Sequence, residues 1–291
     1  MALNLDGLLG YGSKTVVVTG GASGMGDATA RLLGQLGAKV HIVDIQRPKA
    51  PCDSFHQCDL SNFAEVRATA NILNAVAPID FLFPCAGLPP QVKGALYCMR
   101  VNYVGTRLLV EQLLPALADG AGVALISSDA AMGWQRNLAQ SLEMLAISDP
   151  DAAIAWVEAN PGARLRDGYT TSKEMLLVWV QHAAVQLGHD RRIRFNAIAP
   201  CPTRTAFMDQ TEEALGKNFL AKWPYPSLGR MATAEEQAWP LILLNSPLNA
   251  AVTGSVLYTD QGFASGVMTG AIDASILFGR STAGNDEVAA T

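Results

Sequence analysis

The chain has 291 residues, of which 49% are hydrophobic and 16% charged, so it can build one large globular domain or, as the less favoured alternative, two small ones. A net charge of −5 and a pI near 5.4 argue against nucleic acid or an anionic membrane as a partner, because both require a basic surface. No export signal and no apolar run of membrane-spanning length is visible, so we expect a cytoplasmic protein.

Short apolar runs alternate with longer helical patterns along the chain. The strands expected in chain order are Thr15–Thr19, Val40–Asp44, a short strand before Cys58, Ile79–Cys85, Gly122–Ser127, Arg194–Ala199 and Ser255–Thr259. The helices expected between them are Met25–Leu36, Phe63–Val76, Cys98–Leu117, Ser172–Leu187 and Ala234–Leu244. This alternation predicts an α/β fold with a doubly wound parallel sheet and helices on both faces.

Two segments interrupt the alternation within a domain expected to span residues 1–291. Residues 129–167 form an insertion after the fifth strand, with helical patches at Leu138–Ala146 and Ala152–Glu158. Residues 203–226 follow the sixth strand, and a long connection beside a binding face is usually a lid. Residues 265–291 form a C-terminal tail that either covers the cavity or is partly disordered.

A glycine-rich turn, Thr19–Gly26, follows the first strand and precedes a helix. Glycines let backbone amides approach a pyrophosphate, and a helix N-terminus supplies partial positive charge for it. The spacing is G-x-x-x-G-x-G, so an ordinary glycine-rich turn is the alternative without further context. The residues expected at the pyrophosphate are Gly20, Ser23, Gly24, Met25 and Gly26.

An acidic residue ends the second strand at the position where dinucleotide-binding folds hold the adenosine ribose. Asp44 lies eighteen residues after Gly26, close to the roughly 20 that this contact requires. A carboxylate there also repels a 2′-phosphate, so NAD is preferred. Arg47, three residues on, leaves NADP as the lesser alternative.

Later strand ends provide further contacts for the cofactor. Asp59 and Leu60 follow the third strand and are expected beside the adenine. The small residues of Cys85-Ala86-Gly87 let the chain pass beneath the cofactor. Asn102 is a poor helix former inside an apolar helical pattern, which indicates a role for its amide.

Tyr169 and Lys173 carry the strongest chemical signal, because residues four apart lie on one face of a helix. A cation about 4 Å from a phenolate stabilises it by about 4 kcal/mol at an effective dielectric of about 20, which would lower the pKa of the phenol from about 10 toward neutral. Ser128 ends a strand, where open α/β sheets place ligand groups. The pair alone is a weak signal, since any helix with a tyrosine and a lysine can produce it.

Metal chemistry is not expected. The five cysteines lack C-x-x-C spacing and are expected to stay reduced, and the four histidines show no metal-ligand spacing.

These motifs together resemble the short-chain dehydrogenase/reductase family over Lys14 to Ala264. The matching elements are Thr19–Gly26, Asp59, Ala86-Gly87, Asn102, Ser128, Tyr169 with Lys173, Pro200 through Thr205, and Asp260-Gln261-Gly262. The resemblance implies a single-domain Rossmann fold. It also implies that Tyr169 is the acid/base and that Ser128 hydrogen-bonds the substrate oxygen. Lys173 would hold the nicotinamide ribose, Asn102 would anchor a proton-relaying water, and Pro200, Thr203 and Thr205 would contact the cofactor.

The long insertion is similar to that of the bacterial 3α-hydroxysteroid dehydrogenase/carbonyl reductase branch. In that branch the insertion occludes a helix face used for tetramers, which implies a homodimer here, with a homotetramer as the alternative. Three family positions differ in this chain: the usual N-N-A-G reads Pro84-Cys85-Ala86-Gly87, Pro-Gly after the sixth strand reads Pro200-Cys201-Pro202, and Gly262 is preceded by Gln261 where glycine is frequent.

We therefore predict that the chain is an NAD-dependent oxidoreductase that interconverts a bulky hydrophobic cyclic secondary alcohol, of steroid or monocyclic terpenol type, and its ketone. Large apolar side chains at Trp134, Phe207 and Met208 are expected in the substrate pocket, although core packing explains any one of them equally well. A non-catalytic NAD-binding sensor is the alternative, but Ser128, Tyr169 and Lys173 are all present. An epimerase or dehydratase would need a larger C-terminal substrate domain.

Overall fold

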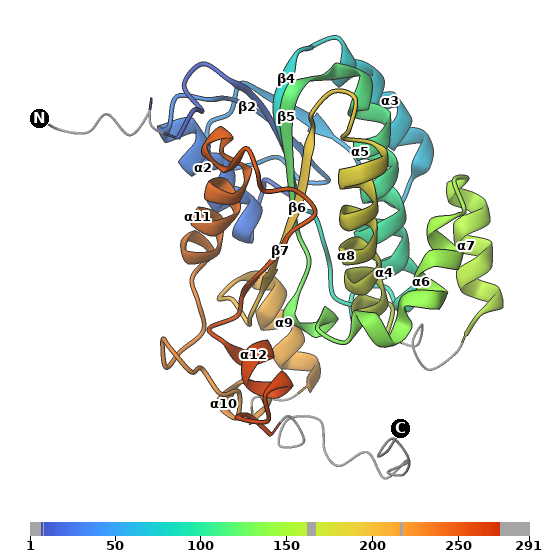
Figure 1. Ribbon diagram of the computed structural model, residues 1–291, viewed down its shortest axis with the longest axis vertical. Helices are drawn as coiled ribbons and strands as arrows, with labels where there is room; N and C mark the ends of the chain where they lie inside the picture. Colours follow the sequence, from blue (N-terminus) through green and yellow to red (C-terminus); the bar gives the residue numbers. More distant parts are fainter. Residues whose placement is uncertain (1–6, 8, 162–166, 216–217, 274–291) are drawn as a thin grey trace, which may run out of the picture.

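A computed structural model describes residues 7, 9–161, 167–215 and 218–273 (Figure 1). Its seven strands form one parallel sheet in the order β3-β2-β1-β4-β5-β6-β7. The strands are β1 (Thr15–Thr19), β2 (Lys39–Asp44), β3 (Ser54–Gln57), β4 (Ile79–Pro84), β5 (Leu117–Ile126), β6 (Arg194–Pro200) and β7 (Val256–Thr259). The strand order reverses between β1 and β4, and such a switch point opens a crevice at the carboxyl edge of the sheet. The predicted doubly wound fold is confirmed.

Helices cover both faces of this sheet (Figure 1). The α-helices are α2 (Gly24–Gln35), α3 (Phe63–Asn74), α4 (Ala95–Met99), α5 (Thr106–Leu113), α6 (Leu138–Leu145), α7 (Pro150–Ala159), α8 (Tyr169–Gln186), α9 (Ala206–Leu215), α10 (Asn218–Ala221), α11 (Ala234–Asn245) and α12 (Phe263–Met268). A π-helical turn, Arg100–Gly105, joins α4 to α5, and short 3-10 turns lie at Leu114–Ala116, Asp129–Ala131, Trp134–Asn137 and Pro247–Asn249.

Two cores form because side chains alternate along each strand. Val16 and Val18 pack toward α2 and α11, whereas Val17 packs into the larger core with α3, α5 and α8. Helix α8 is buried on nearly every side from Thr171 to Val180, since the sheet lies on one side and α4 and α6 on the other. Hence the helix that carries Tyr169 and Lys173 is held by packing on both sides.

The structure corrects two predicted boundaries. Strand β5 begins at Leu117 rather than Gly122, because its glycine-rich start does not read as an apolar strand. The single helix predicted at Cys98–Leu117 is divided by the π-helical turn and ends early at a 3-10 turn containing Pro115. The helices of the insertion, α6 and α7, follow the two predicted patches.

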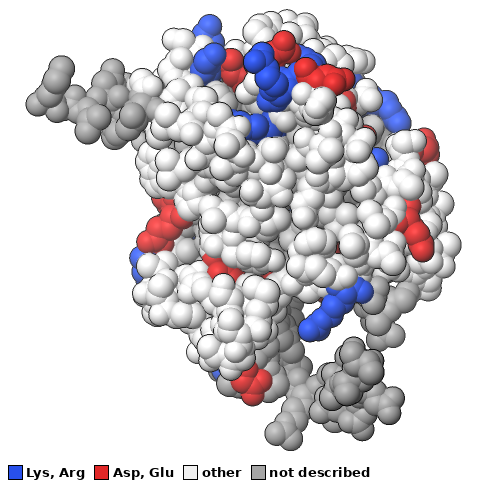
Figure 2. All heavy atoms as spheres, in the orientation of Figure 1, with Lys and Arg blue, Asp and Glu red and all other residues white. Residues whose placement is uncertain are grey.

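In Figure 1, α9, α10 and α12 gather below the sheet, on the side where the strands end. On the face drawn in Figure 2, positive and negative residues are intermixed along the upper rim, and most of the surface below is uncharged. Among the described helices, none combines the length and the apolar character needed to cross a bilayer.

Candidate active site

A cavity of about 1270 Å³ lies where β1, β4, β5 and β6 end. It exceeds the roughly 300–1,000 Å³ common for ligand sites, so it has room for a dinucleotide and a second ligand. The predicted residues that line it are Gly20, Ser23, Gly24, Met25, Gly26, Asp44, Asp59, Leu60, Cys85, Ala86, Gly87, Ser128, Tyr169, Lys173, Pro200, Thr203, Thr205, Phe207 and Met208. Asn102 and Trp134 are not part of its lining.

The glycine turn is shaped by close backbone contacts that only glycine allows. Gly20 has φ +68°, and a Cβ there would lie 2.7 Å from the Ala86 Cα. A Cβ on Gly26 would collide with the Gly20 carbonyl oxygen. The Ser23 hydroxyl does not cap α2, so the first-turn amides of this helix remain available at the cavity wall. This cradle fits a pyrophosphate.

Asp44 lies at one end of the cavity with both carboxylate oxygens oriented by the backbone. Ala22 N donates to one oxygen and Gln46 N to the other, each at 2.9 Å. Each oxygen retains capacity for a ribose hydroxyl. Arg47 instead lies over the Phe55 ring, 5.4 Å from its centroid, and does not line the cavity.

The adenine side contains a contact that sequence reasoning missed. The Tyr97 hydroxyl donates to Asp59 Oδ2 at 3.2 Å, and Lys93 Nζ donates to the Tyr97 hydroxyl at 3.2 Å. Tyr97 also lines the cavity. It was missed because the helix was predicted to begin at Cys98, one residue later.

Ser128, Tyr169 and Lys173 meet on one wall of the cavity. Lys173 Nζ lies 5.7 Å from the centroid of the Tyr169 ring and donates to the Ile126 carbonyl at 2.9 Å. The Ser127 hydroxyl donates to the Lys173 carbonyl at 2.9 Å, which ties α8 to the end of β5. The three groups predicted to act together are therefore neighbours, although they come from two distant segments.

The electrostatics of this wall differ from the prediction. Desolvation by burial raises the pKa of the Tyr169 phenol above its ordinary value, and the nearby Ser128 hydroxyl only partly opposes this. Desolvation also lowers the pKa of Lys173 to about 8. The lowering of the tyrosine pKa that the sequence predicts is therefore not seen in this structure, because burial disfavours both charges and the ammonium is directed to the Ile126 carbonyl.

Asn102 lies behind the wall rather than on it. Its Oδ1 accepts from Leu88 N at 2.9 Å and its Nδ2 donates to the Leu88 carbonyl at 3.0 Å, while the side chain is fully buried. Gly87 separates it from the site: a Cβ there would lie 3.4 Å from Lys173 Nζ and 3.6 Å from Asn102 Oδ1. The amide thus fixes the loop that passes beneath Lys173, and its predicted role toward a water stays a prediction.

Residues 203–226, the predicted lid, supply apolar groups beside the tyrosine. The Phe207 ring centroid lies 5.6 Å from that of Tyr169, and Met208 lines the same space. Val267 and Met268 of α12 add to this lining, so the described start of the tail borders the cavity. Residues 274–291 lie outside the described part of the chain.

The expected pocket role of Trp134 is wrong. Its ring packs against the larger hydrophobic core, at the 3-10 turn that begins the insertion. The neighbouring Gln135 and Arg136 line the cavity instead.

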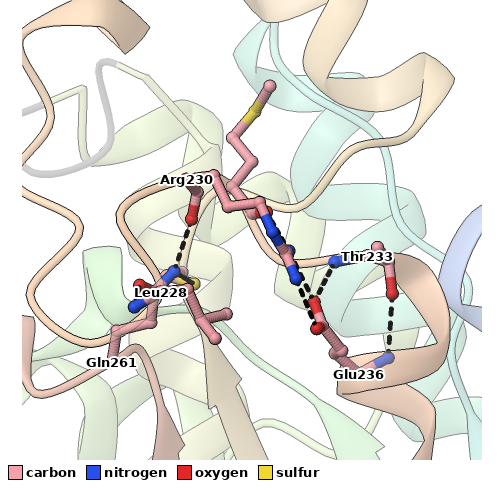
Figure 3. Close-up of polar contacts among 7 residues, drawn as sticks. Leu228, Arg230, Thr233, Glu236 and Gln261 are labelled. Atoms are coloured by element: carbon pink, nitrogen blue, oxygen red, sulfur yellow. Dashed lines mark hydrogen bonds and ion pairs between the residues drawn. The ribbon is translucent and has the colours of Figure 1, made fainter.

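The chain that follows residues 203–226 is bonded to Gln261, just after β7 (Figure 3). Gln261 has a backbone φ of +63°. Its side chain accepts from Leu228 N and donates to the Arg230 carbonyl, both at 2.9 Å. Arg230 in turn pairs with Glu236, which also closes the capping box of α11 with Thr233. The chain between residue 226 and α11 is therefore held at the end of β7 and at the start of α11.

A second missed residue, Asp129, lies directly behind Ser128. The Ser128 hydroxyl donates to Asp129 Oδ1 at 3.1 Å and accepts from Ala130 N at 3.1 Å. Desolvation by burial raises the pKa of Asp129 to about 7, although the Ser128 hydrogen bond opposes this. No sequence signal marks Asp129 as buried, because the groups that enclose it come from distant strand ends.

Known proteins resemble this chain along most of its length. The family model for short chain dehydrogenase matches residues 14–139, and the model for Enoyl-(Acyl carrier protein) reductase matches residues 152–264. A coniferyl-alcohol dehydrogenase from Pseudomonas sp. is 30% identical, with 87% of this chain and 97% of that protein covered. The 3-alpha-hydroxysteroid dehydrogenase/carbonyl reductase of Comamonas testosteroni is 33% identical, with 85% and 95% covered.

A solved structure agrees with the fold. The 3-alpha-hydroxysteroid dehydrogenase from Pseudomonas sp. B-0831, complexed with NADH, superposes with a TM-score of 0.74 at 23% identity, covering 89% of this chain and all of that one.

Proposed function

Since the chain belongs to the short-chain dehydrogenase/reductase family and is an oxidoreductase of that type, we propose that it uses NAD to interconvert a bulky hydrophobic cyclic secondary alcohol and its ketone. The observation that carries this proposal is the meeting of Ser128, Tyr169 and Lys173 on one wall of a cavity large enough for cofactor and substrate.

The chain's own residues divide the work. The Tyr169 phenol removes the proton from the alcohol oxygen, and Ser128 holds that oxygen in place. Lys173, whose Nζ lies 5.7 Å from the centroid of the Tyr169 ring, would hold the ribose of the cofactor. When bound, NAD supplies the hydride acceptor and, in its oxidised form, a positive ring that favours the phenolate.

The preference for NAD over NADP is supported by the charges at the end of the cavity where Asp44 lies. Asp44 lines it and Arg47 does not. A 2′-phosphate there would meet a carboxylate without a facing cation from Arg47.

The hydrophobic substrate is supported by the apolar wall opposite Tyr169. Phe207, Met208, Trp223 and Met268 line it, from the lid and from α12. Among the similar proteins, two carry names that specify cyclic alcohols: the hydroxysteroid dehydrogenase and the 2,5-dichloro-2,5-cyclohexadiene-1,4-diol dehydrogenase of Sphingobium indicum, which is 27% identical over 86% of this chain.

The test is turnover with NAD across a panel of cyclic secondary alcohols, matched primary alcohols and their carbonyl counterparts, followed by absorbance of the reduced cofactor. The proposal predicts activity that is greatest for the hydrophobic cyclic compounds. Saturable NAD binding without turnover of any compound would favour a sensor protein instead.

We also propose that the chain acts as a homodimer or homotetramer. Trp239 and Leu243 on α11 and Leu257 on β7 are exposed apolar side chains that a partner copy could cover. Light scattering at assay concentration distinguishes the two assemblies, and a monomer would contradict both.

A further inference from the structure

Asp129 has a feature that the proposed mechanism does not use. It is 5% exposed and follows Ser128 directly, in the 3-10 turn Asp129–Ala131. Among the described residues, its Oδ2 has no hydrogen-bond partner. A buried carboxylate oxygen without a partner is costly, so the structure disfavours the ionised form of this side chain.

The hydrogen bonds of Ser128 can be counted. A serine hydroxyl has one proton to donate and two lone pairs that accept. The proton is directed to Asp129 Oδ1, and one lone pair accepts from Ala130 N. Only one lone pair is left for the cavity, where the Tyr169 phenol also faces this hydroxyl. With Asp129 ionised, Ser128 can therefore accept from a substrate hydroxyl but cannot donate to a ketone oxygen.

A neutral Asp129 reverses this polarity. Its carboxyl proton can be donated to Ser128 Oγ, which then has its own proton free for the substrate oxygen. No proton leaves Asp129 for the substrate, and Tyr169 remains the acid/base. Only the direction of two hydrogen bonds changes.

We propose that Asp129 is a positioning residue that decides, through its own protonation, whether Ser128 donates to or accepts from the substrate oxygen. This inference rests on the proposed function of the site. It makes the affinity for a ketone-like oxygen, which only accepts, greater at low pH than at high pH. A hydroxyl can donate and accept, so it bonds to Ser128 in either state.

Other titratable groups face Asp129 from each neighbouring element. Tyr169 comes from α8, Cys201 follows β6, and Tyr258 and Asp260 lie on or just after β7. Asp260 raises the pKa of Asp129 and is itself tied down by bonds from Gly262 N and Ala264 N. The transition near pH 7 is thus expected from Asp129. Lys173 acts on a bound oxygen only through Tyr169, so its titration should change the affinity for an accepting oxygen and for a hydroxyl by the same factor.

The test compares two inert ligands on the NADH-loaded enzyme. A cyclic sulfoxide offers an oxygen that only accepts, and a tertiary cyclic alcohol of similar shape offers a hydroxyl that cannot be oxidised. The ratio of their dissociation constants cancels changes in cofactor binding. From about pH 5.5 to about pH 8.5, we expect the preference for the sulfoxide to fall about 10-fold, the effect of one hydrogen bond made or lost.

Asp129→Asn should make this ratio independent of pH, because an amide does not titrate. Asp151→Asn, which changes an exposed carboxylate on α7, should behave as the wild type. A flat ratio in the wild type, or an unchanged pH profile in Asp129→Asn, would overturn the inference. Failure of the proposed function would look different, since neither ligand would then bind the NADH complex at any pH.

Discussion

The preference for NAD is a property of one carboxylate, and it can be tested by removing its charge. Asp44 lines the cavity, and its oxygens are fixed by the amides of Ala22 and Gln46. Asp44→Asn keeps the size of the side chain and one acceptor oxygen while it removes the charge. Its one oxygen can accept from only one of these two amides. With that oxygen on Ala22 N, the glycine turn keeps its bond and the bond from Gln46 N is lost.

The expected size of the effect follows from Coulomb's law. At about 5 Å, a carboxylate repels each unit of phosphate charge by about 1 kcal/mol at the dielectric of water and by about 3 kcal/mol at an effective dielectric of 20. For each unit of phosphate charge, this corresponds to a preference for NAD over NADP of about 5-fold to about 150-fold in the wild type, most of which Asp44→Asn should remove.

Calorimetric titration of both cofactors measures this preference directly. Arg47→Ala is the matched control, because Arg47 lies over Phe55 outside the cavity and its loss should leave the affinity for NADP unchanged. An unchanged NAD to NADP ratio in Asp44→Asn, or a loss of NADP binding in Arg47→Ala, would refute the reasoning.

Three further predictions concern the glycine turn, the lid and Asp129. Gly26→Ala places a Cβ against the Gly20 carbonyl, so overpacking of about 1–3 kcal/mol should weaken NAD binding about 5-fold to 150-fold by calorimetry. Gly34→Ala in the same helix, with open space at its Cβ, should bind NAD as the wild type does, and equal affinities of the two variants would contradict the proposed pyrophosphate site. Gln261→Ala removes the hydrogen bonds to Leu228 and Arg230 but keeps the left-handed backbone, so it should lower the free energy of unfolding in denaturant by about 1–3 kcal/mol. Gln261→Gly should recover about 1 kcal/mol of this loss, because glycine adopts that backbone without strain. An alanine variant as stable as the wild type would show that these bonds contribute little. The folded-state pKa of Asp129 is raised to about 7 from an ordinary 3.8, so between these pH values the folded state binds a proton that the unfolded state has lost, and the wild type becomes less stable as pH rises. The free energy of unfolding of Asp129→Asn should therefore increase relative to that of the wild type from pH 4 to pH 7. A constant difference between the two would contradict the raised pKa.

Much of the architecture could be predicted because it depends on local patterns. The inner strands β1, β4 and β6 are almost wholly buried and read as continuous apolar runs, and the predicted bounds of β1 match the observed ones. The glycine turn and Asp44 were recognised by their spacing, which the backbone of a strand, turn and helix imposes locally.

What the sequence could not predict depends on contacts between distant segments. The π-helical turn at Arg100–Gly105 coincides with the bonds between Asn102 and the Leu88 backbone, and with Gly105 packed directly against the Leu60 carbonyl. The burial of Asp129 arises from groups at the ends of β6 and β7. Trp134 could not be assigned to core or cavity, because both environments favour an aromatic side chain.

The central claim is that Tyr169 is the acid/base of the site, and Tyr169→Phe tests it most directly. The variant should bind NAD as the wild type does while the oxidation of a cyclic alcohol slows by about 100-fold to 10,000-fold, the usual contribution of a positioned acid/base. Tyr103→Phe, a buried tyrosine beside Arg107 and outside the cavity, is the control and should keep its activity. Wild-type turnover in Tyr169→Phe would contradict the account.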